Sequence, residues 1–188
     1  MKLRNARYLA RDIIDELILP GDTVVDATAG NGHDTLYLAQ KVGESGKVYA
    51  FDVQQAALDS TRKRLEENGC AEQAELILDS HANMEQYAEA ERVDCVVFNF
   101  GRLPGGDPKI FTQADSSVRA IESGLRLLKP GGVMAIALYY GKENGYDEKH
   151  AIEQYLKTID DKRFTVLSCE WSNRKWEPPL PILIWKEH

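Results

Sequence analysis

The stretch Thr23-Val-Val-Asp-Ala-Thr-Ala-Gly-Asn-Gly32 joins a short apolar run to a glycine-rich turn, and a helix-period segment follows at residues 34–42. The apolar run over 23–27 predicts a buried strand, and the two glycines let backbone N–H groups of the turn approach a ligand. The start of the following helix adds the positive end of its dipole. A strand, a glycine-rich turn and a helix in this order are typical of a nucleotide-binding parallel sheet.

Strand-like runs and helix-period segments alternate along the rest of the chain, which is the pattern of a parallel sheet covered by helices. We predict further strands at 47–53, 74–79, 93–99 and 132–139, and helices at 3–18, 54–68, 83–89, 115–128 and 147–159. The runs at 163–171 and 180–186 have no helix between them, so a short loop would make them an antiparallel pair.

The predicted fold class is therefore α/β, a doubly wound, seven-stranded Rossmann-like sheet with a C-terminal antiparallel hairpin. A dehydrogenase-type sheet would instead end in a sixth parallel strand, so the hairpin favours the methyltransferase variant. A length of 188 residues suits one domain, and we expect residues 1–188 to form it.

Composition and charge exclude several classes of protein. The net charge of −7 argues against nonspecific nucleic-acid binding, which depends on phosphate neutralisation, but leaves room for a local basic patch. Cys70, Cys95 and Cys169 are far apart and odd in number, so neither a disulfide framework nor a CxxC metal site is indicated. No apolar run approaches the ~20 residues that cross a bilayer, and no signal-peptide core follows the N-terminus. We expect a cytoplasmic protein without a membrane partner.

The glycine-rich turn separates two classes of cofactor. A nicotinamide-binding turn reads G-x-G-x-x-G, but here Thr35 stands at the third glycine position. Asp26 lies four residues before Gly30, and acid-x-x-x-G-x-G is the version in which a carboxylate and backbone groups hold a zwitterionic amino acid. This favours S-adenosylmethionine (SAM) as the cofactor. Asp52 ends the second strand, twenty residues after Gly32, where a carboxylate accepts both ribose hydroxyls.

Polar residues also end the next two strands. Ser80 and His81 follow the third strand, where contacts to adenine are expected, and Asn99 ends the fourth, beside the expected methyl group. The ends of these strands converge at the carboxyl edge of the sheet. The predicted cofactor-binding residues are Asp26, Thr28, Gly30, Asn31, Gly32, Asp34, Thr35, Asp52, Gln54, Ser80, His81 and Asn99. Taken singly, a polar residue at a strand end is more often a turn residue or a helix cap, so the prediction rests on their joint placement. His33 and His81 lack a third ligand at suitable spacing, so no metal is expected.

The segment Asn99-Phe-Gly-Arg-Leu-Pro-Gly-Gly-Asp107 is the candidate for the chemistry. Methyl transfer moves positive charge from sulfur to the acceptor, so the site needs hydrogen-bond acceptors and precise placement. We predict Asn99 and Asp107 as catalytic residues: the Asn99 carbonyl aims an amine, and Asp107 takes up its proton unless it is only a turn residue. The predicted substrate-binding residues are Arg102, Leu103, Gly105, Gly106, Tyr139, Tyr140 and Arg174.

Tyr139 and Tyr140 are candidates to stack a base, and an ordinary strand-end aromatic pair is the alternative. Basic side chains form a second candidate surface: Arg4, Arg7, Arg11, Arg102, Arg174 and Lys175. They either follow a phosphate backbone or, for the helix arginines, form a solvated helix face.

The sequence resembles the MnmM (YtqB-like) methyltransferases, a family also labelled rRNA-methylase-like. The similarity lies in Asp-Ala-Thr-x-Gly-Asn-Gly-x-Asp-Thr at 26–35, Asn-x-Gly-x-Leu-Pro-x-Gly-Asp at 99–107 and the Pro-Pro pair at 178–179, and it covers nearly the whole chain. The family's usual residues are replaced here at Arg7-Tyr8, at Arg102 and at Arg174–Trp176, so the cofactor half matches better than the substrate half.

The resemblance implies N-methylation of the 5-aminomethyl group of 2-thiouridine at the tRNA wobble position, with the anticodon loop of tRNA as the partner. Carried over by position, Gly30, Asn31, Gly32, Asp52 and His81 would face the cofactor and Asn99 the amine. The alternatives are methylation of rRNA or of a small-molecule amine, a catalytically idle SAM- or RNA-binding module, and a nicotinamide-dependent oxidoreductase, which Thr35 and the terminal hairpin disfavour. A homodimer is left open.

Overall fold

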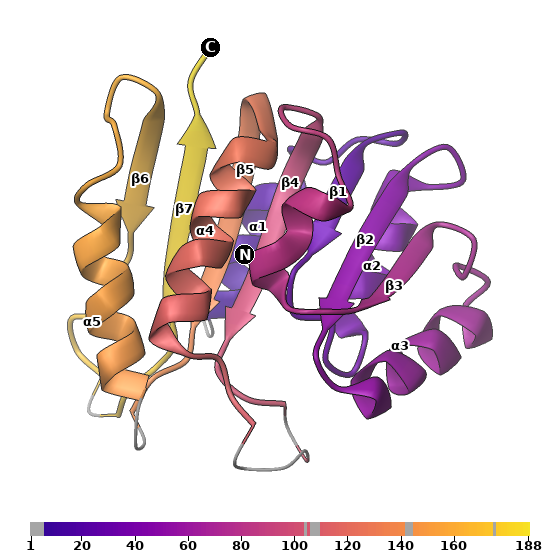
Figure 1. Ribbon diagram of the computed structural model, residues 1–188, viewed down its shortest axis with the longest axis horizontal. Helices are drawn as coiled ribbons and strands as arrows, with labels where there is room; N and C mark the ends of the chain where they lie inside the picture. Colours follow the sequence, from indigo (N-terminus) through magenta and orange to yellow (C-terminus); the bar gives the residue numbers. More distant parts are fainter. Residues whose placement is uncertain (1–5, 104, 106–109, 142–144, 175) are drawn as a thin grey trace.

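The computed structural model describes residues 6–103, 105, 110–141, 145–174 and 176–188. Seven strands form one sheet with helices on both faces (Figure 1). The elements are α1 (Ala6–Ile14), β1 (Thr23–Asp26), α2 (His33–Val42), β2 (Lys47–Asp52), α3 (Gln55–Glu67), β3 (Ala74–Leu78), η1 (His81–Gln86, a 3-10 helix), β4 (Val93–Phe100), α4 (Ala114–Leu127), β5 (Leu128–Leu138), α5 (Gly145–Leu156), β6 (Phe164–Ser168) and β7 (Leu180–Lys186).

The strand order is β3-β2-β1-β4-β5-β7-β6. Strands β1 to β5 pair in parallel, and β7 inserts antiparallel between β5 and β6. The predicted doubly wound sheet with a terminal antiparallel pair is therefore confirmed. Because the order reverses between β1 and β4, the carboxyl ends of these two strands form the switch point where ligands bind in such sheets. In Figure 1 this edge lies at the bottom, where the arrowheads of β2 and β4 end.

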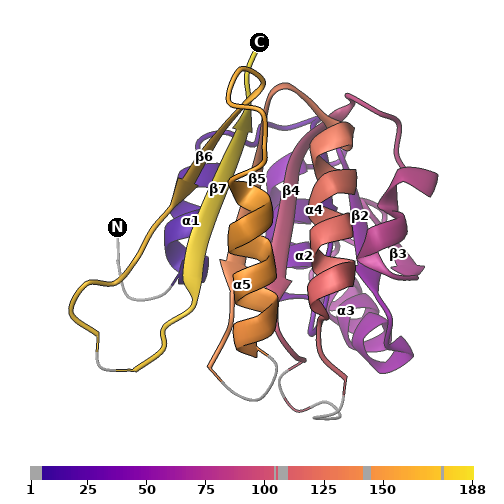
Figure 2. The ribbon, with the colours of Figure 1, turned by 60° about the vertical axis from the view of Figure 1, so that its left-hand side comes forward.

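Alternation along the central strands divides the core between the two faces. In β4, Cys95 and Val97 belong to the cluster formed with α1, α2 and α3, whereas Val96 and Phe98 belong to the cluster formed with η1, α4 and α5. Figure 2 shows α4 and α5 on one side of the sheet and α1 and α2 on the other. This period-two burial on both faces explains the continuous apolar runs of the strands.

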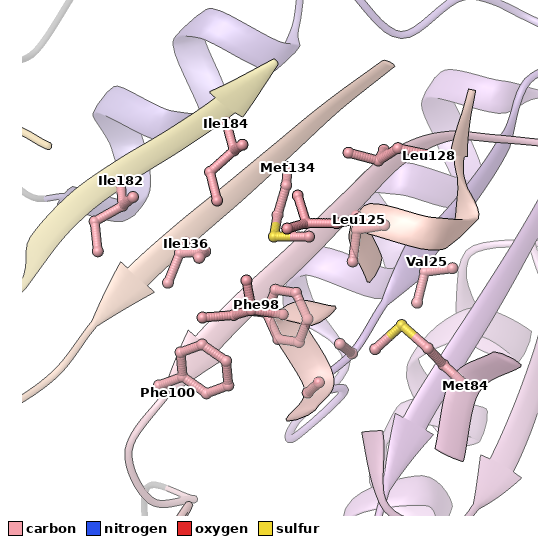
Figure 3. Close-up of a cluster of buried hydrophobic side chains, with 14 of the residues drawn as sticks. Val25, Met84, Phe98, Phe100, Leu125, Leu128, Met134, Ile136, Ile182 and Ile184 are labelled. Atoms are coloured by element: carbon pink, nitrogen blue, oxygen red, sulfur yellow. The ribbon is translucent and has the colours of Figure 1, made fainter. Parts of the chain in front are cut away.

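The cluster on the α4 side is the larger one and runs from β1 to β7. Figure 3 shows Phe98 of β4 beside Met134 of β5, with Leu125 of α4 packed against them. Phe98 and Phe100 stack with ring centroids 4.7 Å apart, and both are fully buried. Strand β4 also ends at the switch point, so these two rings give a rigid base to Asn99, which lies between them in the sequence.

Several predicted boundaries are wrong. The first helix ends at Ile14 rather than at residue 18, and the turn after it buries Ile18 while leaving Leu17 exposed. The short helix begins at His81, two residues early, because Ser80 Oγ caps it by accepting from the Ala82 N–H at 3.2 Å. Strand β6 ends at Ser168, so residues 169–179 form a longer connection to β7 than the predicted short loop.

None of the described helices combines the length and apolar character that a membrane-spanning helix requires.

Candidate active site

A cleft of about 180 Å³ opens at the carboxyl edge, beside the ends of β1, β2 and β4. Nine of the predicted site residues line it together: Thr28, Gly30, Asp52, Gln54, Ser80, His81, Asn99, Arg102 and Leu103. Asp79, which ends the predicted third strand beside Ser80, lines the cleft as well, whereas sequence reasoning missed other lining residues, among them Phe51, Val53, Phe111 and Thr112. Phe51 and Val53 flank the predicted acid Asp52, and this adjacency is a signal that could have found them. Nothing in the sequence marks Phe111 or Thr112.

The glycine-rich turn is held from behind by α3. Gly32 has φ +74°, and a Cβ there would lie 2.7 Å from Thr61 Cα, so only glycine fits. Thr61 Oγ1 donates to the carbonyl of Gly30 at 3.1 Å, and Arg64 Nε donates to the carbonyl of Asn31 at 2.7 Å. Gly32 and Asn31 therefore shape the turn through their backbone, and neither lines the cleft.

Asp52 joins the turn to the end of β2. Its Oδ2 accepts from the Gly30 N–H at 3.0 Å, and its Oδ1 accepts from the Gln54 N–H at 2.9 Å. Burial raises the pKa of this carboxyl, and hydrogen bonds from the backbone of Gln54, Gly30 and Val53 oppose that rise. Each oxygen keeps a lone pair for a further donor, so the carboxylate can still accept hydroxyl hydrogens from a ligand in the cleft.

Asp26 and Thr35 do not reach the cleft. Both side chains are fully buried, and Thr35 Oγ1 donates to Asp26 Oδ2 at 2.6 Å. The other oxygen of Asp26 accepts from the Thr28 N–H at 3.1 Å. These contacts tie β1 to α2 beneath the turn, so the structure places the two residues behind the site that they were predicted to line.

His81 lies between the cleft and the aromatic core. Its ring makes edge contacts with Phe98 and Phe100, at centroid distances of 6.1 and 5.7 Å. Burial lowers the pKa of His81 to about 4, while a hydrogen bond with the Ala27 backbone opposes the shift. The imidazole is therefore neutral near pH 7. A neutral ring among aromatic side chains is suited to an uncharged heterocycle such as adenine.

Asp79 and Ser80 form the adjoining wall of the cleft. Hydrogen bonds from Asn83, the Ser80 N–H and Tyr87 lower the pKa of Asp79, and the Asn83 bond is the largest cause. Asp79 thus stays a charged acceptor at the end of β3. Its neighbour Ser80 caps η1 and also lines the cleft.

Asn99 is anchored at two points. Its backbone N–H donates to Thr28 Oγ1 at 2.8 Å, and its side-chain Nδ2 donates to Asp34 Oδ2 at 2.9 Å. Asn99 lines the main cleft and also a smaller, mostly apolar pocket between α1, α2 and the ends of β4 and β5. Asp34 lines only this second pocket, together with Arg11 and Tyr37.

The predicted substrate residues are spread over the same edge of the sheet. Arg102 and Leu103 line the cleft, and Leu103 Cδ1 lies 3.4 Å from the Cβ position of Gly30. The cleft lining does not include Tyr139, Tyr140, Arg174 or Gly105. Gly106, Asp107, Arg4 and Lys175 lie outside the described residues, and the Arg7 side chain is not described. Within the described ranges, no group of three or more His, Cys, Asp or Glu could hold a metal ion.

The cleft has the features that SAM requires: a glycine-rich turn, a carboxylate with spare lone pairs at the end of β2, and apolar and neutral aromatic walls. Solved structures agree. A "putative rRNA-methylase" from Clostridium thermocellum has a TM-score of 0.96 and 38% identity over 99% of this chain and all of that chain. The "putative methyltransferase" SMU.1697c from Streptococcus mutans, solved with S-adenosylhomocysteine (SAH), has a TM-score of 0.89 and 34% identity over 98% of this chain and 99% of that one.

The fold and the cleft thus define a SAM-dependent methyltransferase. A model of the family described as "Putative rRNA methylase" matches residues 48–185, and the chain belongs to that family. A relative from Arabidopsis thaliana, "tRNA (mnm(5)s(2)U34)-methyltransferase, chloroplastic", is 33% identical over 98% of this chain and 71% of its own length. The predicted enzyme class, cofactor and family resemblance are confirmed.

Proposed function

We propose that this enzyme methylates the primary amine of 5-aminomethyl-2-thiouridine at the wobble position of tRNA. The observation that carries the proposal is Asn99, an amide at the end of β4 whose side chain lines the cleft and is fixed by a hydrogen bond. The name of the Arabidopsis relative, which describes methylation at U34 of tRNA, supports the same substrate.

The cofactor residues that we propose surround the cleft from three strand ends. Bound SAM supplies a methyl group on a positively charged sulfur. Asp52 accepts the ribose hydroxyls, while Thr28 and Gly30 line the part of the cleft next to the glycine-rich turn and hold the amino-acid end. His81 and Phe51 form the apolar wall against adenine. Gln54, Ser80 and the backbone of the turn complete the enclosure.

Asn99 acts on the acceptor. A primary amine attacks through its lone pair, so it must be neutral and correctly aimed. The Asn99 carbonyl oxygen accepts one N–H of the amine, which turns the lone pair toward the cofactor. This hydrogen bond strengthens as the nitrogen gains positive charge, so it stabilises the transition state more than the ground state. No oxyanion develops, which agrees with an acceptor rather than a donor at this position.

An RNA loop fits the surface around the cleft. Three aromatic side chains are exposed there. Tyr139 follows β5 and is 38% exposed, and Tyr146 lies in the first turn of α5 and is 49% exposed. Trp176 precedes β7 and is 57% exposed. All three positions lie at the carboxyl edge, because Leu180 at the start of β7 pairs with Leu138 at the end of β5. Exposed rings stack on unpaired bases, and the neighbouring arginines supply charge for the backbone phosphates. The overall charge of −7 makes this a local rather than a general affinity for RNA.

The test uses tRNA that carries 5-aminomethyl-2-thiouridine, isotopically labelled SAM and mass spectrometry of the released nucleosides. We expect one labelled methyl on the wobble nucleoside. Label in rRNA or in a small amine, with none in tRNA, would replace the proposal with one of those acceptors. SAH binding without methylation of any RNA would indicate an idle binding module.

A matched pair of variants separates cofactor binding from chemistry. Asn99→Ala should leave the SAH dissociation constant within about twofold and lower kcat by roughly 10- to 100-fold, the worth of a hydrogen bond to a charged group. Asp52→Ala should weaken SAH binding instead. Equal loss of SAH binding and turnover in Asn99→Ala would show that Asn99 has been given the wrong role.

A further inference from the structure

We propose that Asp34 is a positioning residue that sets the orientation of the Asn99 carboxamide for methyl transfer. This inference rests on the proposed function, and it gives Asp34 a role different from the cofactor contact predicted from the sequence. The relevant juxtaposition joins residues 65 positions apart: Asn99 Nδ2 donates to Asp34 Oδ2 at 2.9 Å. Asp34 belongs to the first turn of α2, and Asn99 to the end of β4.

The chemistry of this hydrogen bond decides which end of the amide faces the acceptor. An ionised carboxylate only accepts hydrogen bonds, so the amide must turn its NH₂ group toward Asp34. The oxygen of Asn99 then points away from Asp34. Within the described part of the chain, no group donates to Asn99 Oδ1. The carbonyl is therefore held in place with its lone pairs available to an amine.

The location of the pair supports the assignment. Asn99 lines both the main cleft and the smaller pocket, whereas Asp34 lines only the smaller pocket. Asp34 therefore lies on the far side of Asn99 from the proposed cofactor residues. Thr28 fixes the backbone of Asn99 at 2.8 Å, so rotation of the carboxamide is the main freedom left. Asp34 removes that freedom.

The negative charge has a second effect. A hydrogen bond from an amide N–H to a carboxylate polarises the amide and makes its oxygen a better acceptor, as in other chains of hydrogen bonds. The acceptor nitrogen becomes positive during transfer, so a more basic carbonyl oxygen gains most in the transition state. Geometry and charge are separable, because Asp34→Asn keeps an acceptor oxygen but loses the charge, whereas Asp34→Ala loses both.

The experiment measures kcat and KM for aminomethyl tRNA, SAH affinity by calorimetry and melting temperature for each variant. We expect Asp34→Ala to lower kcat by about 10- to 100-fold, with SAH affinity and KM for tRNA within about threefold of the wild type. Asp34→Asn should retain several-fold more activity than Asp34→Ala. The control is Asp115→Ala, because Asp115 lies in the first turn of α4 and its side chain is 88% exposed. It reports the loss of a first-turn helix charge and of an exposed ion pair with Arg119, and it should leave kcat unchanged.

A charge swap provides the rescue. Asn99→Asp alone places two carboxylates at hydrogen-bond distance, so the pair shares one proton and position 99 no longer presents a fixed acceptor oxygen to the amine. The double variant Asp34→Asn/Asn99→Asp restores an amide-to-carboxylate hydrogen bond in the opposite direction. Its kcat should be about tenfold higher than that of Asn99→Asp alone. Rescue of this kind does not follow from a merely structural role.

Three results would overturn the inference: a wild-type kcat in Asp34→Ala, a parallel loss of SAH affinity in the Asp34 variants, or no recovery in the double variant. Failure of the proposed function appears differently, because the wild-type enzyme itself would then leave aminomethyl tRNA unmethylated. If the wild-type enzyme methylates this tRNA and the Asp34 variants are equally active, only the role of Asp34 is refuted.

Discussion

Gly32→Ala is the sharpest test of how the glycine-rich turn is built. Gly32 has φ +74°, and a side chain in this left-handed region costs about 1–2 kcal/mol. The new Cβ would also lie 2.7 Å from Thr61 Cα, a backbone atom of α3 that cannot rotate away. Overpacking of this kind costs roughly 1–3 kcal/mol, so the free energy of unfolding should fall by about 2–5 kcal/mol in total.

Gly69→Ala is the matched control. Gly69 has φ +67°, but nothing lies within 4 Å of its Cβ position, so only the conformational cost of about 1–2 kcal/mol applies. Urea unfolding followed by circular dichroism gives both free energies, provided that the m-values agree. SAH calorimetry should show weaker binding for Gly32→Ala alone. Equal destabilisation by the two substitutions would refute the close approach of the turn to α3.

Three further predictions concern titratable groups. Asp52→Ala should weaken SAH binding by about 10- to 100-fold in calorimetry, because it removes a charged acceptor; unchanged affinity would place the ribose elsewhere. Because burial lowers the pKa of His81 to about 4, the unfolded chain takes up a proton below pH 6.5 that the folded chain does not. The free energy of unfolding should therefore drop between pH 6.5 and 4 by on the order of 3 kcal/mol, and less in His81→Asn. Glu148 is buried and accepts from Ser117 Oγ, so Glu148→Ala should lower the melting temperature more than Glu148→Gln; the reverse order would contradict this pairing.

The position of the cleft follows from the fold rather than from any one motif. Asp52 and Asn99 come from strands that pair with β1 on opposite sides, so the reversal of strand order brings them to the same edge. The rings of Phe98 and Phe100 lock the end of β4 from the opposite face. A site on strand ends supported by a dense core is more rigid than one carried by loops, which suits a reaction that depends on placement.

The sequence alone determined the fold class and the cofactor. Few alternatives to this sheet agree with the sequence pattern. The pattern has apolar runs buried on both faces, helix-period segments between them, and a final pair of strands without a helix. Asp26, Gly30 and Gly32 indicated SAM because their spacing differs from that of nicotinamide-binding turns. These features are local, and local patterns of polarity and glycine are visible without knowing what packs against them.

Only the tertiary structure decided which polar residues reach the cleft. Asp26 turns inward to Thr35, and Thr61 and Arg64 of α3 hold the turn, although nothing in their own segment indicates this. The contact between Asp34 and Asn99 likewise spans 65 residues. Spacing along the chain gives the face of a strand or helix on which a side chain lies. Its hydrogen-bond partner depends on strand register and on how each helix is rotated against the sheet, and both are set by packing of the whole core.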